Sequence, residues 1–234
     1  MQMHFLIGGI QKTSLLDYPD KISAIVFTQG CNFNCGYCHN PRLLSSKLKE
    51  DICQPDVFFE FLKKRKGKLD GVVITGGEST LQPDIEEFIT EIKSMNFLVK
   101  LDTNGYRPEV TEKLLSKNLI DYIAMDIKGP LDKYSLITRR EIDTKKIKQS
   151  IDIIMNSNID YEFRTTVLPV QIQIEDFESI GKLIRNAKKY YLQKFLVQSE
   201  INDKTLIKER NYTDEEFYTI INILRQYVKF VAIR

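Results

Sequence analysis

The stretch that decides the fold of this chain reads Ile22-Ser-Ala-Ile-Val-Phe-Thr28, then Gln29-Gly30, then Cys31-Asn-Phe-Asn-Cys35-Gly-Tyr-Cys38. Its first part is mostly β-branched or apolar, which predicts a buried β-strand. A loop is expected to follow, because Gly30 and Gly36 permit the tight backbone turns that wrapping a ligand requires. Three cysteines therefore belong to one loop at the end of the first predicted strand.

Short strand patterns alternate with longer amphipathic ones over the rest of the chain. Several strand candidates are nearly continuous in apolar residues, as expected of parallel strands that are covered on both faces. The strands predicted after the first one are Gly71–Thr75, Phe97–Leu101, Tyr122–Met125, Glu162–Val167, Lys194–Val197 and Phe230–Ile233. Apolar residues at helical spacing predict two helices with one buried face. These residues are Ile85, Phe88, Ile89 and Ile92 in one helix, and Ile147, Ile151 and Ile154 in the other.

Length and local signals together indicate the fold class. Thr213 with Glu216 three residues later resembles a capping box and predicts the start of a further helix. Six or seven strand–helix units exhaust the 234 residues, whereas a closed eight-unit barrel usually takes about 250. The sequence therefore predicts an α/β fold in the form of an incomplete, laterally open barrel.

The composition is that of a globular protein, with 42% hydrophobic and 28% charged residues. We predict a single domain spanning residues 1–234. A formal net charge of +2 creates no global field that would attract nucleic acid or an anionic membrane. No signal pattern and no apolar run of roughly 18 residues is present, so the expected location is the cytoplasm. A reducing cytosol makes a disulfide framework of the four cysteines unlikely to form, which favours metal or redox chemistry.

The spacing Cys31-x3-Cys35-x2-Cys38 indicates what the loop holds. A four-iron, four-sulfur cluster normally takes four protein ligands, so three cysteines with no fourth nearby leave one iron open to a substrate. An open iron can chelate the amino and carboxylate groups of S-adenosylmethionine, and an electron passed through the cluster breaks the sulfonium bond to the 5′ carbon. The loop therefore predicts chemistry based on a 5′-deoxyadenosyl radical. Cys53 is interpreted as a structural thiol.

Three other readings use the same residues. Cys35-Gly-Tyr-Cys38-His39 matches the attachment motif of a c-type haem, but haem attachment normally requires export. A zinc site of the three cysteines and His39 has suitable ligands, although the vicinal Cys38 and His39 would strain a tetrahedral site. Three buried core cysteines are disfavoured by the glycine and asparagine neighbours, which are typical of a loop.

Unusual polar residues recur where later strands end, which is the functional edge of a parallel barrel. They are Thr75-Gly76-Gly77-Glu78, Asp102-Thr103-Asn104-Gly105 and Asp126-Ile-Lys128-Gly129. Gly76 and Gly77 lack a Cβ and let the backbone approach a ligand, while Glu78 can accept from an ammonium group. Each motif alone could be a turn or a helix cap. Together they suit ribose hydroxyls, a carboxylate and a bound cation.

Further candidates lie inside or beside the predicted strands. Arg164 stands within an apolar strand and needs a partner, for which Glu162 is a candidate if both side chains point into the barrel. Tyr37 can stack on adenine or pack within its loop. Gln198 and Ser199 would add polar contacts to the adenosyl group. The basic run Lys63–Lys66 is interpreted as a solvated helix end rather than a docking site.

These motifs resemble the radical S-adenosylmethionine superfamily, and within it the activating enzymes of glycyl radical enzymes, most of all those of anaerobic ribonucleoside-triphosphate reductase. The similarity covers most of the chain. It runs through Thr13–Pro19, Phe27–Pro41, Gly76–Glu78, Asp102–Gly105 and Met125–Lys128. The resemblance implies a partial (β/α)6 TIM-type barrel and one 4Fe-4S cluster held by the three cysteines.

The same resemblance implies roles for individual residues. Gly76, Gly77 and Glu78 would bind the methionine amino group of S-adenosylmethionine. Asp102, Thr103 and Asp126 would lie near this cofactor and a monovalent cation. Tyr37, Asn104, Lys128 and Arg164 complete the expected cofactor-binding set. The sequence departs from the family pattern at Ala124, where relatives place a methionine near the cation, with Met125 beside it; only Cys53 follows the first motif, so no auxiliary cluster is expected.

The implied reaction is abstraction of a hydrogen atom from a glycine of a large partner enzyme, expected to be anaerobic ribonucleoside-triphosphate reductase. A flavodoxin or ferredoxin would supply the electron. Alternatives within the same chemistry are an activator of pyruvate formate-lyase or of another glycyl radical enzyme, and a small-molecule radical enzyme. From a different class, an electron carrier or a zinc-stabilised binding module would require a coordinatively closed metal site.

Overall fold

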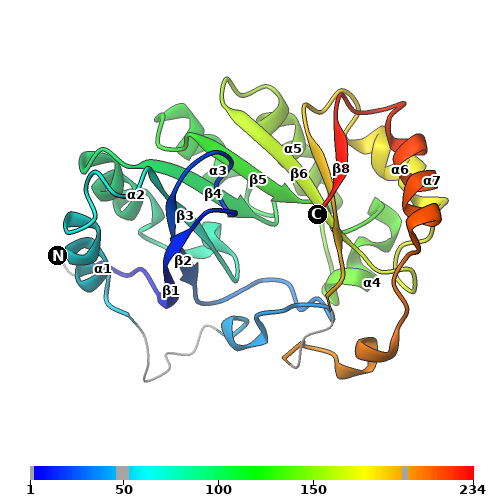
Figure 1. Cartoon of the computed structure of the whole chain (residues 1–234), viewed down its shortest axis with the longest axis horizontal. Coiled ribbons are helices and arrows are strands. Elements are labelled where there is room, and N and C mark those ends of the chain that lie inside the picture. Colours follow the sequence, from blue (N-terminus) through cyan, green and yellow to red (C-terminus); the bar gives the residue numbers. More distant parts are fainter. Residues whose placement is uncertain (1–2, 46–52, 197–199) are drawn as a thin grey trace.

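The computed structural model describes residues 3–45, 53–196 and 200–234, and its centre is one curved sheet (Figure 1). The strands follow one another across the sheet in chain order. They are β1 (Ile7–Ser14), β2 (Ser23–Thr28), β3 (Gly71–Gly76), β4 (Leu98–Thr103), β5 (Tyr122–Asp126), β6 (Asp160–Val167), β7 (Tyr190–Lys194) and β8 (Val231–Ile233). Strands β2 to β8 pair in parallel and β1 pairs antiparallel to β2. Among the described residues β1 and β8 do not pair, so the barrel is open between them.

Helices pack on the outer side of this sheet (Figure 1). They are α1 (Pro55–Lys63), α2 (Ile85–Ser94), α3 (Pro108–Ser116), α4 (Tyr134–Thr138), α5 (Thr144–Met155), α6 (Asp176–Leu183) and α7 (Asp214–Leu224). Each strand from β2 to β7 is followed by at least one of them before the next strand begins. The predicted partial (β/α)6 barrel, laterally open, is therefore confirmed. None of the described helices is long and apolar enough to cross a membrane.

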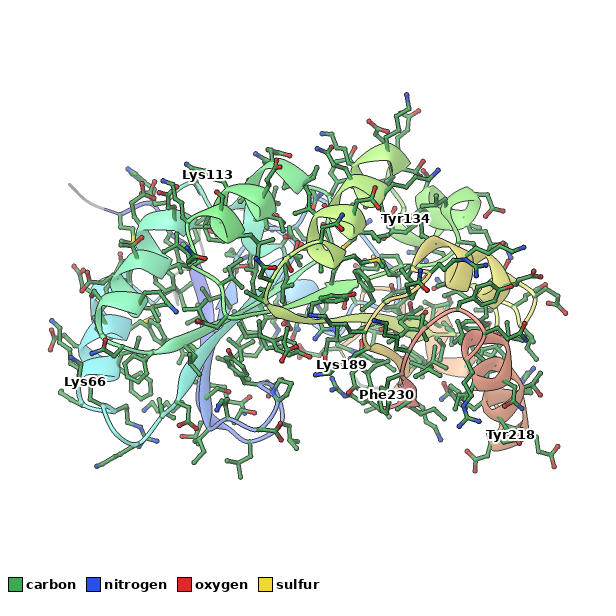
Figure 2. The ribbon with its side chains drawn as sticks, turned by 90° about the horizontal axis from the view of Figure 1, so that it is seen from above. Lys66, Lys113, Tyr134, Lys189, Tyr218 and Phe230 are labelled. Carbon is green, nitrogen blue, oxygen red and sulfur yellow. The ribbon has the colours of Figure 1, made fainter. Side chains whose placement is uncertain are left out.

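The helix predictions are confirmed in detail. The apolar stripes of α2 and α5 are almost completely buried against the sheet. Helix α7 begins with the predicted capping box, in which Glu216 N donates to Thr213 Oγ1 (3.2 Å) and Thr213 N donates to the Glu216 carboxylate (2.8 Å). The basic run at the end of α1 is largely exposed, and Figure 2 shows Lys66 at the outer edge of the molecule.

One strand prediction is wrong, and one strand was not predicted. Strand β7 covers Tyr190–Lys194 instead of Lys194–Val197, because Tyr190, Tyr191 and Leu192 are the residues in register with β6 and β8. Val197 lies outside the described residues. Strand β1 was not predicted, since its Gly8-Gly9 pair lowers the strand signal of the sequence. Pairing with β2 supplies the hydrogen bonds that local propensity does not.

The inside of the barrel is divided between apolar and charged side chains. Tyr18, Ile25, Val73 and Tyr122 form a small apolar cluster, separate from the main core between sheet and helices. It lies toward the ends where the parallel strands begin. The polar side chains face inward nearer the carboxyl ends of the strands, where the candidate site is found.

Candidate functional site

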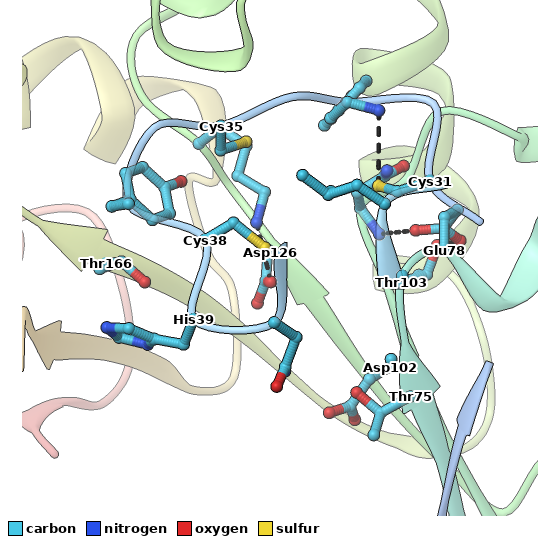
Figure 3. Close-up of a pocket in the computed structure, with 18 of the residues that line it drawn as sticks. Cys31, Cys35, Cys38, His39, Thr75, Glu78, Asp102, Thr103, Asp126 and Thr166 are labelled. Carbon is cyan, nitrogen blue, oxygen red and sulfur yellow. Dashed lines mark hydrogen bonds and ion pairs between the residues drawn. The ribbon is translucent and has the colours of Figure 1, made fainter. Parts of the chain in front are cut away.

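A cavity of about 270 Å³ lies at the carboxyl ends of the strands, under the cysteine loop (Figure 3). The cluster-binding and cofactor-binding residues that the family resemblance implies all line it. These residues are Cys31, Cys35, Tyr37, Cys38, Gly76, Gly77, Glu78, Asp102, Thr103, Asn104, Asp126, Lys128 and Arg164. They come from the cysteine loop and from the ends of four strands, β3 to β6, so the fold brings together groups that are up to 133 positions apart (164 − 31).

The cysteine loop is held in place by backbone hydrogen bonds at its start, in its middle and at its end, where Asn202 N donates to Cys38 O (3.1 Å). Gly30 N and Cys31 N donate to the carbonyl oxygens of Leu43 and Leu44 (2.7 and 3.2 Å). In the middle of the loop, Asn34 N donates to Thr138 O (2.9 Å). Gly30 has a φ of 95°, which confirms the predicted turn at this glycine. Backbone hydrogen bonds therefore fix the conformation of the loop, and its three cysteines line the pocket.

The three cysteine thiols are protonated in the absence of iron, because their pKa values are raised. Burial raises the pKa of Cys31 to about 12, and the Glu78 carboxylate adds to this effect. Burial also raises the pKa of Cys35 and Cys38, while the Lys128 ammonium opposes it. Iron binding needs thiolates, so cluster assembly would release protons, and Lys128 would then face the negative charge of the sulfurs.

A mononuclear zinc site fits these residues poorly. His39, its required fourth ligand, stacks on Phe195 with ring centres 5.7 Å apart, and its Nε2 lies 2.9 Å from Leu196 O. Within the described ranges, no three Cys, His, Asp or Glu side chains converge as tightly as ligands around a single metal ion. A larger four-iron cluster needs wider spacing, and three thiols on one loop beside one pocket fit that donor set.

Gly76 and Gly77 are needed for close backbone packing, which differs from the reason expected from the sequence. A Cβ at Gly77 would lie 2.1 Å from Gly30 O, and Gly76 has a φ of 120° that side chains rarely adopt. This close approach lets Gly77 N donate to Thr28 O (3.0 Å) and Glu78 N donate to Gly30 O (2.8 Å). The two glycines thus join the end of β3 to the start of the cysteine loop.

Glu78 links the segments that follow β3 and β4 in the pocket wall. Only 1% of it is exposed, and its carboxylate accepts four hydrogen bonds. Oε1 accepts from Thr80 N (3.1 Å), Thr80 Oγ1 and Thr103 Oγ1 (2.7 Å), and Oε2 accepts from Asn104 N (2.7 Å). Burial raises its pKa, but these donors oppose that effect, and four donors fit the ionised form. Asn104 in turn donates to Asn32 of the cysteine loop (2.8 Å).

Glu78→Gln is expected to lower the free energy of unfolding by about 1–3 kcal/mol and to weaken S-adenosylmethionine binding, because the new NH₂ group would face a donor. Urea denaturation and equilibrium dialysis measure the two effects. Glu60→Gln is the matched control, since Glu60 is an exposed residue that pairs with Lys63 on the surface of α1. If Glu78→Gln behaves like Glu60→Gln in both measurements, the carboxylate does not organise the pocket.

Five charged side chains from β4, β5 and β6 form a continuous series, here named the charged ladder: Lys100, Asp102, Arg164, Asp126 and Lys128. Lys100 Nζ pairs with Asp102 Oδ1, and Arg164 Nη1 lies 3.0 Å from Asp102 Oδ2. Arg164 Nε then lies 2.9 Å from Asp126 Oδ1, and Lys128 Nζ lies 3.0 Å from Asp126 Oδ2. Each carboxylate is thus bound between two cations.

The ladder keeps its charges in spite of burial. Burial by itself would raise the pKa of Asp102 and Asp126, but Arg164 and the neighbouring lysine outweigh it and hold both pKa values low. Burial would likewise lower the pKa of Lys128, and Asp126 reverses this effect. Three cations and two anions leave a net charge of +1 on this wall (3 − 2), which favours a bound carboxylate group.

Two predictions about neighbours of the ladder can be compared with the structure. Arg164 does not pair with Glu162, so that suggested partner is wrong. Glu162 instead pairs with Arg234 (Nη1 to Oε1, 2.8 Å) and accepts from the Tyr122 hydroxyl (2.9 Å). The Tyr37 ring is 5% exposed and has the Lys128 ammonium 5.8 Å from its centre, which leaves little of it open to an adenine.

Sequence reasoning missed several residues of the site. Asn202 Nδ2 donates to Asn34 Oδ1 (2.9 Å) and to Cys35 O (3.0 Å), and no local pattern links residues so far apart. Thr166 and Gln193 line the pocket on neighbouring strands. Strand alternation from Arg164 could have indicated Thr166, whereas Gln193 was missed because β7 was placed too late. Gln198 and Ser199 lie outside the described residues.

Comparison with known proteins identifies the family. Residues 25–187 match the Radical SAM superfamily. A protein of Methanocaldococcus jannaschii named "putative glycyl-radical enzyme activating enzyme" is 36% identical over 239 residues, which cover 99% of this chain and 97% of that protein. The pyruvate formate-lyase-activating enzyme of Clostridium pasteurianum is 28% identical over 80% of each chain.

A solved structure has the same fold. The structure of TYW1 with a bound lysine-pyruvate adduct superposes with a TM-score of 0.61 at 18% identity, over 87% of this chain and 73% of that one. The sequence match covers most of the chain, and it includes the cysteine loop and the strands that carry the charged ladder. The chain therefore belongs to the radical SAM superfamily, in the branch that includes the glycyl-radical enzyme activating enzymes.

Proposed function

We propose that this enzyme activates a glycyl radical enzyme by abstracting a hydrogen atom from one of its glycines, and that the partner is anaerobic ribonucleoside-triphosphate reductase. The observation that carries the proposal is the convergence of Cys31, Cys35 and Cys38 with Glu78 and the charged ladder around one cavity. The full-length similarity to a relative named as an activating enzyme supports the same reaction class.

The 4Fe-4S cluster and S-adenosylmethionine, when bound, supply the 5′-deoxyadenosyl radical. The three cysteines would hold the cluster, and Glu78 would keep the Thr103 hydroxyl and the backbone N of Asn104 in position beside it. Lys128 and Arg164 supply positive charge on this wall of the pocket, which suits the carboxylate of the methionine group. The electron would come from a flavodoxin or ferredoxin.

The open side of the barrel supports a protein substrate. A second cavity of about 230 Å³ shares His39 and Asn40 with the first and reaches Gly8 and Gly9 of β1. The cavity thus extends from the cysteine loop toward the strand at the open edge. An extended loop of a partner could follow this path, since the two glycines add no side chains to its wall.

The inner wall also carries polar groups that suit a peptide backbone. In the described part of the chain, the side chains of Thr166 and Gln193 line the pocket without a hydrogen bond to another residue. A hydroxyl and a carboxamide offer both donors and acceptors, as a peptide group requires. These two residues are proposed contacts of the partner's glycine loop.

The test uses the anaerobically reconstituted, reduced protein with S-adenosylmethionine and a purified partner. A glycyl radical signal in electron paramagnetic resonance with anaerobic ribonucleoside-triphosphate reductase, absent when its radical glycine is replaced by alanine, would support the proposal. A signal with pyruvate formate-lyase instead would favour the second candidate, which the 28% identical relative suggests. Turnover of a small molecule with neither partner radicalised would overturn both.

A further inference from the structure

The family resemblance implies a monovalent cation near Asp102, Thr103 and Asp126, but the carboxylate groups are not free to bind one. All four of their oxygens are paired with a cationic side chain of the protein itself. Asp102 is held by Lys100 and Arg164, and Asp126 by Arg164 and Lys128. A sodium or potassium ion bound to these oxygens would lie next to the buried ammonium or guanidinium group already paired there, and repulsion between like charges disfavours its binding.

The other expected ligands of such a cation are the Thr103 hydroxyl, which is already hydrogen-bonded within the protein, and a methionine, which is replaced by Ala124. The Thr103 hydroxyl donates to Glu78 (2.7 Å) and accepts from Gly105 N (3.1 Å). Ala124, at the position where the family resemblance would place a methionine, offers only a methyl group. The Met125 side chain is buried on the other side of β5, where its sulfur would lie 2.8 Å from a Cβ placed on Gly105. The residues of this chain therefore do not fit a bound monovalent cation.

Lys100 is the unusual member of this group. It is 1% exposed, although burying an ammonium group is costly unless it is paired. Its Nζ pairs with Asp102 and lies 6.0 Å from the centre of the Tyr122 ring, whose face favours a cation. Strand alternation places Lys100 on the same inner face of β4 as Asp102. A buried lysine at this position provides one positive charge that is part of the protein and does not depend on the ions in the solvent.

We propose that the Lys100 ammonium takes the place of the monovalent cation, and that S-adenosylmethionine binding by this protein is independent of sodium and potassium. Lys100 acts as a positioning residue. Lys100 binds one oxygen of Asp102, which leaves the other oxygen to bind Arg164. Arg164 in turn positions Asp126, and Asp126 positions Lys128. This inference rests on one part of the proposed function, the binding of S-adenosylmethionine. It does not depend on which partner enzyme is activated.

The first experiment measures the dissociation constant of S-adenosylmethionine by equilibrium dialysis on the reconstituted wild-type protein. The buffers contain sodium, potassium or tetramethylammonium, the last being too large for a cation site. The expected result is the same affinity, within about twofold, in all three buffers. An affinity that collapses in tetramethylammonium would overturn the proposal, whatever the behaviour of any variant.

The second experiment uses Lys100→Met, which is one atom shorter than lysine and therefore removes the ammonium group and empties its position beside Asp102, with Lys100→Arg as the conservative control. Loss of one charge at a buried pair is expected to weaken binding about tenfold or more in tetramethylammonium. Added sodium or potassium should restore much of the affinity to Lys100→Met, because the space beside Asp102 is then free. Lys100→Arg should bind as the wild type does in every buffer.

A purely structural role for Lys100 would give another pattern. Lys100→Met would then lose thermal stability, and its weaker binding would not respond to the kind of cation, which would contradict the proposal. Thermal unfolding of the unreconstituted protein in the same three buffers gives a readout that needs no activity. The cation proposal can be tested by 5′-deoxyadenosine formation in the absence of a partner enzyme. The proposed function is tested only by the glycyl radical assay, so the two can fail independently.

Discussion

Cys35→Ala is expected to abolish the formation of 5′-deoxyadenosine, with a loss of about a thousandfold or more in rate. Cys35 lies at the middle of the cysteine loop and is 6% exposed within the pocket. Two remaining thiolates cannot hold a four-iron cluster that already has one open iron. The measurement is anaerobic reconstitution with iron and sulfide, reduction with dithionite, and chromatography of the product.

Cys53→Ala is the matched control for this experiment. Cys53 lies outside the pocket, next to β1, where its backbone N donates to Ile7 O (3.1 Å). Its replacement should leave the iron content and the product yield unchanged. A reconstituted Cys35→Ala protein that still cleaves S-adenosylmethionine, or a Cys53→Ala protein that does not, would show that the cluster is held elsewhere. A coloured, reducible wild-type protein that forms no product would favour the electron-carrier reading.

Arg164→Leu is expected to lower the free energy of unfolding by about 3–5 kcal/mol, because it leaves two buried carboxylates each with one cation instead of two. Arg164 is the central member of the charged ladder, and its side chain is 13% exposed. S-adenosylmethionine binding should weaken as well, since the net charge of the ladder falls from +1 to 0 (2 − 2). Urea denaturation followed by circular dichroism measures the stability.

Arg210→Leu is the control, because Arg210 pairs with Glu216 at the surface and its side chain is 61% exposed. Its effect should be much smaller, as expected of solvent-screened pairs. The double variant Arg164→Leu with Asp126→Asn should recover part of the lost stability, since one unpaired negative charge is removed. Equal stability of Arg164→Leu and Arg210→Leu would mean that the ladder does not contribute to the folded state.

The fold was predictable because its signals are local. The apolar stripes of α2 and α5 and the capping box of α7 are set by side chains three or four residues apart. Strand β1 was missed because it depends on pairing with β2 and not on its own residues. Strand β7 was misplaced because an apolar run continues past Lys194, and only the register with β6 and β8 decides where pairing ends.

The reaction class is predicted by residues that lie close together in the sequence. The spacing of Cys31, Cys35 and Cys38 requires no partner from elsewhere in the chain, and parallel strands must bring their carboxyl ends to one edge. The strand-end motifs could therefore be assigned to one site before the structure was known. Residues such as Glu78 and Asp126 were found in this way.

The pairing of these groups depends on contacts between strands that are far apart in the sequence. Arg164 meets Asp102 and Asp126 through the register of β4, β5 and β6, and Asn202 reaches the cysteine loop across 168 positions of sequence. Such contacts depend on which residues of neighbouring strands lie side by side and face inward. A one-residue change of register would replace every partner, so local spacing carries no record of them. Burial then strengthens each pairing, and in the charged ladder every oxygen of Asp102 and Asp126 has a cationic side chain of the protein as its partner.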